Sequence, residues 1–184
     1  MSQDILSLDA TALLAAYRTR TLSPREALDA VLQHVERCEP VVNAFALVDA
    51  DAARDAARAS EERWMRGVPE GLVDGVPVTI KDALLWKGRP TRAGSKTSPS
   101  DAAPEDAPSV GELLGAGAIA FGKTTLPEFG WKPVGDSPLY GITRNPWDTR
   151  MTTGGSSAGA GAAAALNLGM LHVGMDSAGS IRVP

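Results

Sequence analysis

The segment Gly75-Val76-Pro77-Val78-Thr79-Ile80-Lys81-Asp82 decides how this chain folds. It is a short apolar run with β-branched residues, which is typical of a strand buried inside a sheet. Helical patterns precede this segment, and after it helical patterns alternate with short apolar runs at Ala118–Phe121 and Met170–Met175. The alternation predicts an α/β fold, with a sheet covered by helices on both faces.

Three helices are predicted before Gly75. Ser23-Pro24-Arg25-Glu26 combines an N-cap, a proline in the first turn and a capping-box glutamate, and the amphipathic helix that it begins is expected to stop near Pro40. A shorter helix is expected around Ala10–Arg18 and a third over Asp49–Arg66. We interpret these helices as a scaffold.

The segments after Lys81 are richer in loops. Residues Lys87–Pro108 contain much Pro, Ser, Gly and Asp and predict a long surface excursion, and Pro127–Pro146 is also expected to be loop-rich. Gly111–Gly117 resembles the end of a helix, and the alanine-rich Ser157–Leu168 predicts another helix. The expected organisation is one domain over residues 1–184, with a helical scaffold at 1–70 and an α/β core at 71–184.

Composition excludes several classes of protein. The 184 residues carry 18 basic and 22 acidic side chains, a net charge of -4, which argues against a basic face for nucleic acid or a membrane. The single cysteine, Cys38, excludes an intramolecular disulfide framework. With no basic region at the N-terminus we expect no signal peptide and a cytoplasmic location.

One segment, Thr152–Met175, is long enough to span a bilayer and carries no charge. Glycines, serines and Asn167 interrupt it, and it contains few large apolar residues. We therefore expect a buried helix followed by a strand, and no membrane partner.

Residues Gly117–Thr124 match the phosphate-binding pattern GxxxxGK[ST] letter for letter. That mechanism needs a strand before the first glycine and a helix after the lysine. Here a helical segment precedes Gly117, the middle residues form a strand pattern, and Pro127 follows Lys123 closely. The context disfavours a nucleotide site.

Gly155-Ser156-Ser157-Ala158-Gly159 fits the nucleophile elbow GxSxG. In that motif the acid and histidine partners follow the serine along the chain. The two histidines, His34 and His172, leave no histidine after Asp176. A Ser-His-Asp hydrolase is therefore disfavoured.

Lys81 closes the apolar run at a position where a charged amine is costly. A desolvated lysine has a lowered pKa and can act as a neutral base. The alternative is a lysine that extends to solvent from the strand end or pairs with Asp82. Both interpretations are open at this point.

Ser156 and Ser180 are expected to lie close together. A helix over Ser157–Leu168 advances about 18 Å and a strand over Met170–Met175 returns about 20 Å, so the two legs nearly cancel. Helix N-termini and glycine-rich turns present free N–H groups, as a developing oxyanion requires. The alternative is a packing unit with incidental serines.

At this point the motifs resemble the amidase signature family. The residues that carry the resemblance are Gly75–Asp82, Gly122–Gly130, Thr143–Asp148, Gly154–Ser157 and Asp176–Pro184. The resemblance implies a mixed sheet and a Ser–cis-Ser–Lys triad, with Ser180 as nucleophile, Ser156 as bridging serine after a cis peptide, and Lys81 as base. It also implies an oxyanion hole from the backbone N–H groups of Ser177, Ala178 and Gly179, and no metal or organic cofactor.

The sequence departs from the family pattern in two ways. Ala158 and Ala178 stand where the family commonly has glycine, and the Cβ of Ala178 restricts the backbone of the oxyanion loop. Family members are also several hundred residues long, so we expect this chain to be a truncated fragment of a larger domain.

The resemblance implies an amidase that hydrolyses a carboxamide of a small-molecule substrate through a serine acyl-enzyme. Two alternatives stay open: the glutamine-hydrolysing subunit of a tRNA-dependent amidotransferase, and an inactive fragment. Expected partners are accordingly either a second copy in a homodimer or further amidotransferase subunits, without direct nucleic-acid binding.

Overall fold

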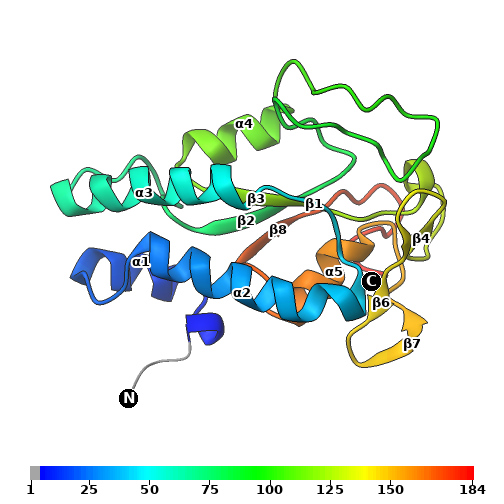
Figure 1. The fold of residues 1–184 in the computed structure, drawn as a ribbon, viewed down its shortest axis with the longest axis horizontal. Helices are drawn as coiled ribbons and strands as arrows, with labels where there is room; N and C mark the ends of the chain where they lie inside the picture. The colour runs from blue at the N-terminus through cyan, green and yellow to red at the C-terminus, as the bar shows by residue number, and fades with distance from the viewer. Residues whose placement is uncertain (1–4) are drawn as a thin grey trace.

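A computed structural model describes residues 5–184 of the chain. Residues 1–4, which contribute to the expectation of no signal peptide, lie outside the described part. The main elements, in chain order, are α1 (Ala10–Thr19), α2 (Pro24–Val42), β1 (Phe45–Val48), α3 (Ala50–Arg66), β2 (Pro77–Lys81), α4 (Pro108–Gly115), β3 (Ile119–Thr124), α5 (Ala158–Ala165) and β8 (Leu171–Val173). Figure 1 shows these elements along the chain.

The main sheet is mixed, with the strand order β1-β3-β2-β8. Strand β2 lies parallel to both β3 and β8, and it pairs Lys81 with Thr124 and Val78 with Leu171. Strand β1 runs antiparallel to β3 and occupies one edge. The prediction of an α/β fold is confirmed, but the sequence analysis predicted no strand at Phe45–Val48.

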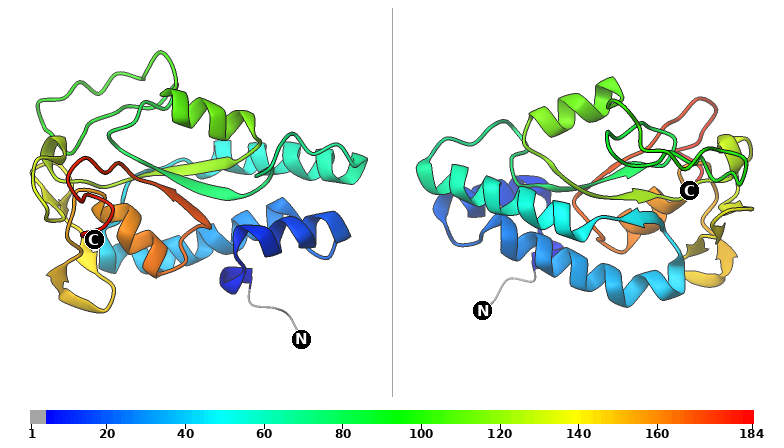
Figure 2. Two further views of the ribbon diagram at one scale, coloured as in Figure 1. Left: turned by 180° about the vertical axis from the view of Figure 1, so that it is seen from behind. Right: turned by 45° about the horizontal axis from the view of Figure 1, so that its top comes forward.

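Helices cover both faces of this sheet, as predicted. Alternate residues along Ala118–Phe121, at the start of β3, enter different cores: Ile119 and Phe121 pack with α2, α3 and α5, whereas Ala118 and Ala120 pack with Val110 of α4. Figure 2 shows α4 and α5 on opposite sides of the strands. The carboxyl ends of β2, β3 and β8 therefore open at one end of a sheet that is buried on both faces.

The three N-terminal helices form where the capping signals place them. Ser23 and Glu26 make the reciprocal capping box, and Asp9 and Asp49 cap α1 and α3. Helix α2 extends two residues beyond its expected stop, because Pro40 lies in the last turn and Asn43, with a φ of 52°, ends the helix.

The loop-rich segments also take their expected places. The excursion over 87–107 contains only isolated bridges, and residues 127–157 contain a 3₁₀ turn, η2 (Glu128–Gly130), and two small antiparallel pairs. These pairs are β4 (Asp136–Ser137) with β5 (Gly141–Ile142), and β6 (Arg144–Asn145) with β7 (Asp148–Thr152). The residues before the Gly155 motif lack a buried-strand pattern, and β7 is indeed largely exposed.

The uncharged segment Thr152–Met175 forms the end of β7, the short helix α5 and strand β8. Within residues 5–184, no helix has both the length and the apolar character needed to cross a membrane. The phosphate-loop pattern fails for the predicted reason, because Ile119–Thr124 is strand β3 and Lys123 is buried inside it.

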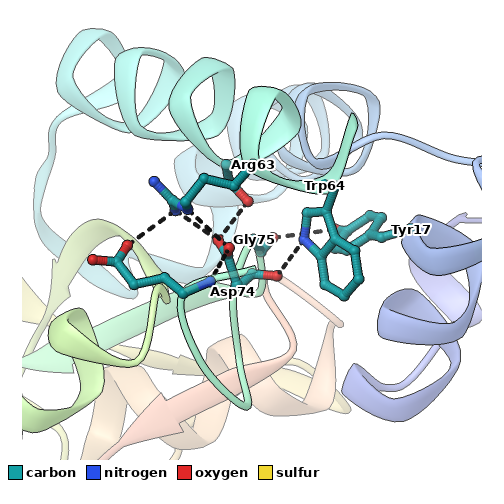
Figure 3. Close-up of polar contacts among 7 residues, drawn as sticks. Tyr17, Arg63, Trp64, Asp74 and Gly75 are labelled. Atoms are coloured by element: carbon teal, nitrogen blue, oxygen red, sulfur yellow. Dashed lines mark hydrogen bonds and ion pairs between the residues drawn. The ribbon is translucent and has the colours of Figure 1, made fainter. Parts of the chain in front are cut away.

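The loop that leads into β2 is held by Asp74, which is fully buried. Its carboxylate accepts hydrogen bonds from Arg63 of α3 at 2.6 and 2.9 Å, and its carbonyl accepts one from the indole of Trp64 at 3.1 Å. The Tyr17 hydroxyl donates to the carbonyl of Gly75 at 3.1 Å (Figure 3). These contacts join α1 and α3 to the amino end of β2.

Candidate active site

Lys81 is the last residue of β2 and is 2% exposed. Its Nζ lies 2.7 Å from Ser156 Oγ, 3.0 Å from Ser157 Oγ and 3.5 Å from the carbonyl oxygen of Met175. The side chain therefore ends among neutral oxygens instead of extending to solvent. The interpretation of Lys81 as a solvent-reaching lysine is wrong.

Asp82 does not pair with Lys81 either. Its Oδ1 lies 2.8 Å from Nζ of Lys123 on β3, and its Oδ2 accepts a hydrogen bond from the Tyr140 hydroxyl at 2.7 Å. Successive residues of a strand point to opposite faces, which separates the neighbouring side chains of Lys81 and Asp82. The sequence left open a salt bridge between Lys81 and its neighbour Asp82. That alternative is wrong, because Asp82 forms its ion pair with Lys123.

Ser156 lies in the turn between β7 and α5, and the Gly155–Ser156 peptide is cis, as the resemblance implies. Ser157 follows as the N-cap residue of α5. A Cβ on Gly159, in the first turn, would meet the carbonyl oxygen of Ala44 at 2.1 Å, so only glycine permits this approach. The close packing holds the start of α5, and with it Ser156, against the end of β3.

The loop after β8 returns to the same place. The backbone N–H of Ser157 donates to the carbonyl of Ser180 at 3.0 Å. The helix and strand between them are shorter than predicted, at Ala158–Ala165 and Leu171–Val173. The two serine-bearing segments nevertheless lie next to each other as expected, because the helix and the strand are both shorter than predicted and their lengths still nearly cancel.

A cavity of about 420 Å³ opens at this end of the sheet. Lys81, Ser156 and Ser180 all line it, together with Ser177, Ala178 and the aromatic residues Phe129 and Trp131. The Ser180 hydroxyl has no hydrogen-bond partner among residues 5–184, whereas Ser156 Oγ accepts from Lys81. The arrangement places a free hydroxyl, a hydrogen-bonded hydroxyl and a buried amine around one space.

Burial lowers the pKa of Lys81 from its usual value to about 8, and the charge of Asp176 opposes that shift. Asp176 is held by Arg182, which contacts its carboxylate at 2.8 and 3.0 Å. Hydrogen bonds from Arg182 and from the Ile181 N–H keep the pKa of Asp176 well below its usual range. A substantial fraction of Lys81 is therefore neutral near pH 8.

The three residues of the expected oxyanion loop differ in what their N–H groups do. The N–H of Gly179 donates to Asp176 Oδ1 at 2.7 Å. The N–H groups of Ser177 and Ala178 donate to no acceptor within residues 5–184. Ala178 does not have a positive φ, so its Cβ is compatible with the loop.

Two site features escaped the sequence analysis. Ser157 contacts Lys81, and its Oγ also accepts from the Met175 N–H at 3.3 Å. The doubled serine of Gly154–Ser157 was the available signal. Phe129 and Trp131 line the cavity, and nothing in their spacing indicated this.

The two histidines lie in other contacts. His34 contacts the carbonyl of Leu166 at 2.9 Å, and His172 contacts the Thr79 hydroxyl at 2.9 Å. In the part of the chain that the structure describes, no three His, Cys, Asp or Glu side chains are grouped to hold a metal ion.

Comparison with known proteins gives one family. The model of the Amidase family matches residues 26–184. Over 170 residues the chain is 41% identical to an indoleacetamide hydrolase of Bradyrhizobium diazoefficiens, covering 92% of this chain and 32% of that protein. It is 39% identical over 181 residues to a glutamyl-tRNA(Gln) amidotransferase subunit of Acidothermus cellulolyticus, covering 98% of this chain and 36% of that one.

The structural comparison agrees with the sequence comparison. The native peptide amidase of Stenotrophomonas maltophilia superposes with a TM-score of 0.89 at 28% identity, over 95% of this chain and 37% of that chain. The 184 residues thus span roughly a third of the length of these relatives, with 32% and 36% coverage of the two curated proteins.

Proposed function

The chain belongs to the amidase family, and from that premise we propose that it carries the catalytic serines and lysine of an enzyme that hydrolyses carboxamides. The observation that carries the proposal is the position of Lys81. The residue is 2% exposed, its amine lies 2.7 Å from Ser156 Oγ, and it lines a cavity that Ser180 also lines. A buried lysine without a carboxylate partner is suited to act as a base.

The proposed first step is acylation of Ser180. Neutral Lys81 takes the hydroxyl proton of Ser156, and Ser156 takes the proton of Ser180 as the Ser180 oxygen attacks the amide carbon. This requires the Ser180 side chain to turn its free hydroxyl toward Ser156. The proton then returns from Lys81 through Ser156 to the leaving nitrogen, which departs as ammonia or an amine.

Water completes the cycle in the proposal. Lys81 and Ser156 deprotonate a water that attacks the acyl carbon, and Ser180 regains its proton as the acid leaves. The free N–H groups of Ser177 and Ala178 would donate hydrogen bonds to the carbonyl oxygen and stabilise the negative charge that develops on it. Gly179 would contribute by shaping the loop, since its own N–H is bound to Asp176.

The experiment is active-site labelling of the complete gene product with a fluorophosphonate, followed by peptide mass spectrometry. We expect the label on Ser180 and its loss in the Ser180→Ala variant, with amide turnover reduced by about 10³-fold or more. Ser100→Ala, at an exposed serine that does not line the cavity, is the matched control. A fully active Ser180→Ala protein would contradict the proposal.

The amidotransferase subunit is the second candidate, because a relative with that name matches 98% of this chain. Both candidates use the same proposed serines and lysine and differ in what reaches the cavity. Ammonia release from glutamine that depends on co-purified subunits would favour the amidotransferase. Turnover of simple amides by the isolated protein would favour a free-standing amidase.

A further inference from the structure

Exposed apolar residues gather at the cavity of the candidate active site. Phe129, Trp131 and Met175 are 63%, 91% and 41% exposed, and all three line this cavity. Large apolar residues that remain exposed beside a concave site are typical of a surface that a ligand covers. The cavity therefore has an apolar side in addition to its serines and its lysine.

The same cavity offers little to bind a charged ligand. Within residues 5–184, Lys81 is the one ionisable side chain that lines it, and the proposed mechanism uses that amine as the base. Ala83, Leu126 and Ala178 continue the apolar lining. An ammonium group buried here would find no carboxylate in this lining, and a carboxylate would find only the base, so both would be costly to bury. An uncharged apolar group fits the lining better.

Both aromatic residues belong to one tight turn, because Phe129 lies in η2 and Trp131 is its C-cap residue. Gly130 lies between them with a φ of 67°, and a Cβ at this position would lie 3.2 Å from Ser156 Oγ. The backbone of the turn thus lies directly against Ser156. One aromatic residue precedes this close approach along the chain and the other follows it.

The turn is held in a conformation that its sequence does not favour. Phe129 has a φ of 52°, in the left-handed region that large L-residues rarely adopt. Its N–H donates to the carbonyl of Ala93 at 2.8 Å, and the carboxylate of Glu128 accepts a hydrogen bond from the buried Ser95 hydroxyl at 2.7 Å. Unfavourable backbone conformations that neighbouring contacts maintain cluster at ligand sites. These contacts fix the place of the aromatic residues beside the cavity.

We propose, on the basis of the function proposed above, that Phe129 and Trp131 contact the substrate and select carboxamides that carry an uncharged aromatic or other bulky apolar group. The carboxamide carbon of such a substrate lies at Ser180, and its apolar group lies against the turn. Glutamine carries an ammonium and a carboxylate besides its side-chain amide, and it matches this lining poorly. Of the two candidate functions, the lining therefore favours the free-standing amidase.

The experiment compares phenylacetamide with acetamide, which share the reacting carboxamide and differ by the ring. Both are assayed with the complete gene product, and kcat/KM for phenylacetamide is divided by kcat/KM for acetamide. The variants are Phe129→Ala and Trp131→Ala. Trp147→Ala is the matched control, because Trp147 is 85% exposed and does not line the cavity.

We expect the parent protein to favour phenylacetamide by about 10- to 100-fold, and each cavity variant to lower this ratio about tenfold, since an apolar contact to the ring is lost. Trp147→Ala should keep the parental ratio. A cavity variant that keeps the ratio, as it would if another part of the protein covered the two aromatic residues, would overturn the proposal. Equal losses for both amides, or a parent that prefers glutamine to phenylacetamide, would overturn it too.

Binding without turnover gives a second measurement. In the Ser180→Ala background, titration calorimetry gives the Kd of phenylacetamide with and without the Phe129→Ala and Trp131→Ala changes. We expect each change to raise this Kd about tenfold, and Trp147→Ala to leave it at its starting value. A Kd that neither cavity change alters would contradict a contact between the substrate and the turn.

The outcomes separate this inference from the proposed function. If the parent protein shows no amidase activity, yet binds phenylacetamide in a way that depends on Phe129 and Trp131, the proposed function alone is wrong. If an active amidase keeps its substrate preference in both variants, the aromatic selection alone is wrong.

Discussion

Strand β2 has a buried ionisable residue near each of its ends, and the two residues differ in whether a counter-ion contacts them. At the amino end, Asp74 contacts Arg63 (Figure 3), and its carboxylate also accepts hydrogen bonds from the Ser60 hydroxyl at 2.7 Å and the Glu70 N–H at 2.8 Å. At the carboxyl end, Lys81 is met by two hydroxyls and a carbonyl. One charge is neutralised in place, and the other is left without a counter-ion in contact.

The pKa shifts express the same difference. Burial acts to raise the pKa of Asp74, but hydrogen bonds from Arg63, Ser60 and the Glu70 N–H outweigh it and lower the pKa. Burial lowers the pKa of Lys81 to about 8, and the opposing charge of Asp176 only partly offsets it. Both shifts lower a pKa, yet one stabilises an ion and the other destabilises one. The ion-paired Asp74 therefore contributes stability, whereas the unpaired Lys81 reduces it, as the base that we propose would.

The largest expected effect is that of Lys81→Met. We expect kcat/KM for an amide substrate to fall by about 10³-fold or more, because the base of the proposed mechanism is lost. At pH 7 the free energy of unfolding should rise by about 1–3 kcal/mol, since a charged amine is no longer desolvated. Urea unfolding and amide turnover measure the two effects, and a variant that loses stability would contradict the comparison.

Asp74→Asn should do the reverse. Removing one partner of a buried ion pair leaves Arg63 without its counter-ion, and we expect the free energy of unfolding to fall by about 3 kcal/mol. At temperatures where the variant stays folded, kcat/KM should equal that of the parent. A loss of turnover without a loss of stability would show that the two ends of β2 are not independent.

The pH dependence should follow Lys81. A base must be deprotonated, and the folded pKa of about 8 lies below that of an unperturbed lysine. Below pH 8, kcat/KM should therefore fall about tenfold per unit. Stability has the same sign: the unfolded chain binds the Lys81 proton more tightly, so stability should rise with pH from about 8 to about 10.4, the usual lysine pKa. A profile centred near pH 6 would point to a different base.

Tyr17→Phe gives the smallest expected effect. The change removes the hydroxyl that donates to the Gly75 carbonyl and keeps the ring that packs 5.9 Å from Trp64. We expect a loss of about 1 kcal/mol in the free energy of unfolding and no change in kcat/KM. An effect on turnover would mean that strain at the amino end of β2 reaches Lys81.

The sequence was informative where the signal is local. A cap and an amphipathic pattern predicted α2, and a run of apolar residues predicted β2, because these patterns act through neighbours in the chain. Strand β1 was missed because it has four residues and is partly exposed, so its pattern is too short to read. What places it is its pairing with β3.

The candidate site divides in the same way. The motifs by themselves determined the family, and through the resemblance they singled out Lys81, Ser156 and Ser180, which line one cavity. Only the tertiary structure decided which lysine forms an ion pair with Asp82, because β3 brings Lys123 to that carboxylate from 41 positions away in the sequence. Side chains that are neighbours in a strand point apart, and ion pairs in a buried sheet are therefore set by the packing of strands and loops.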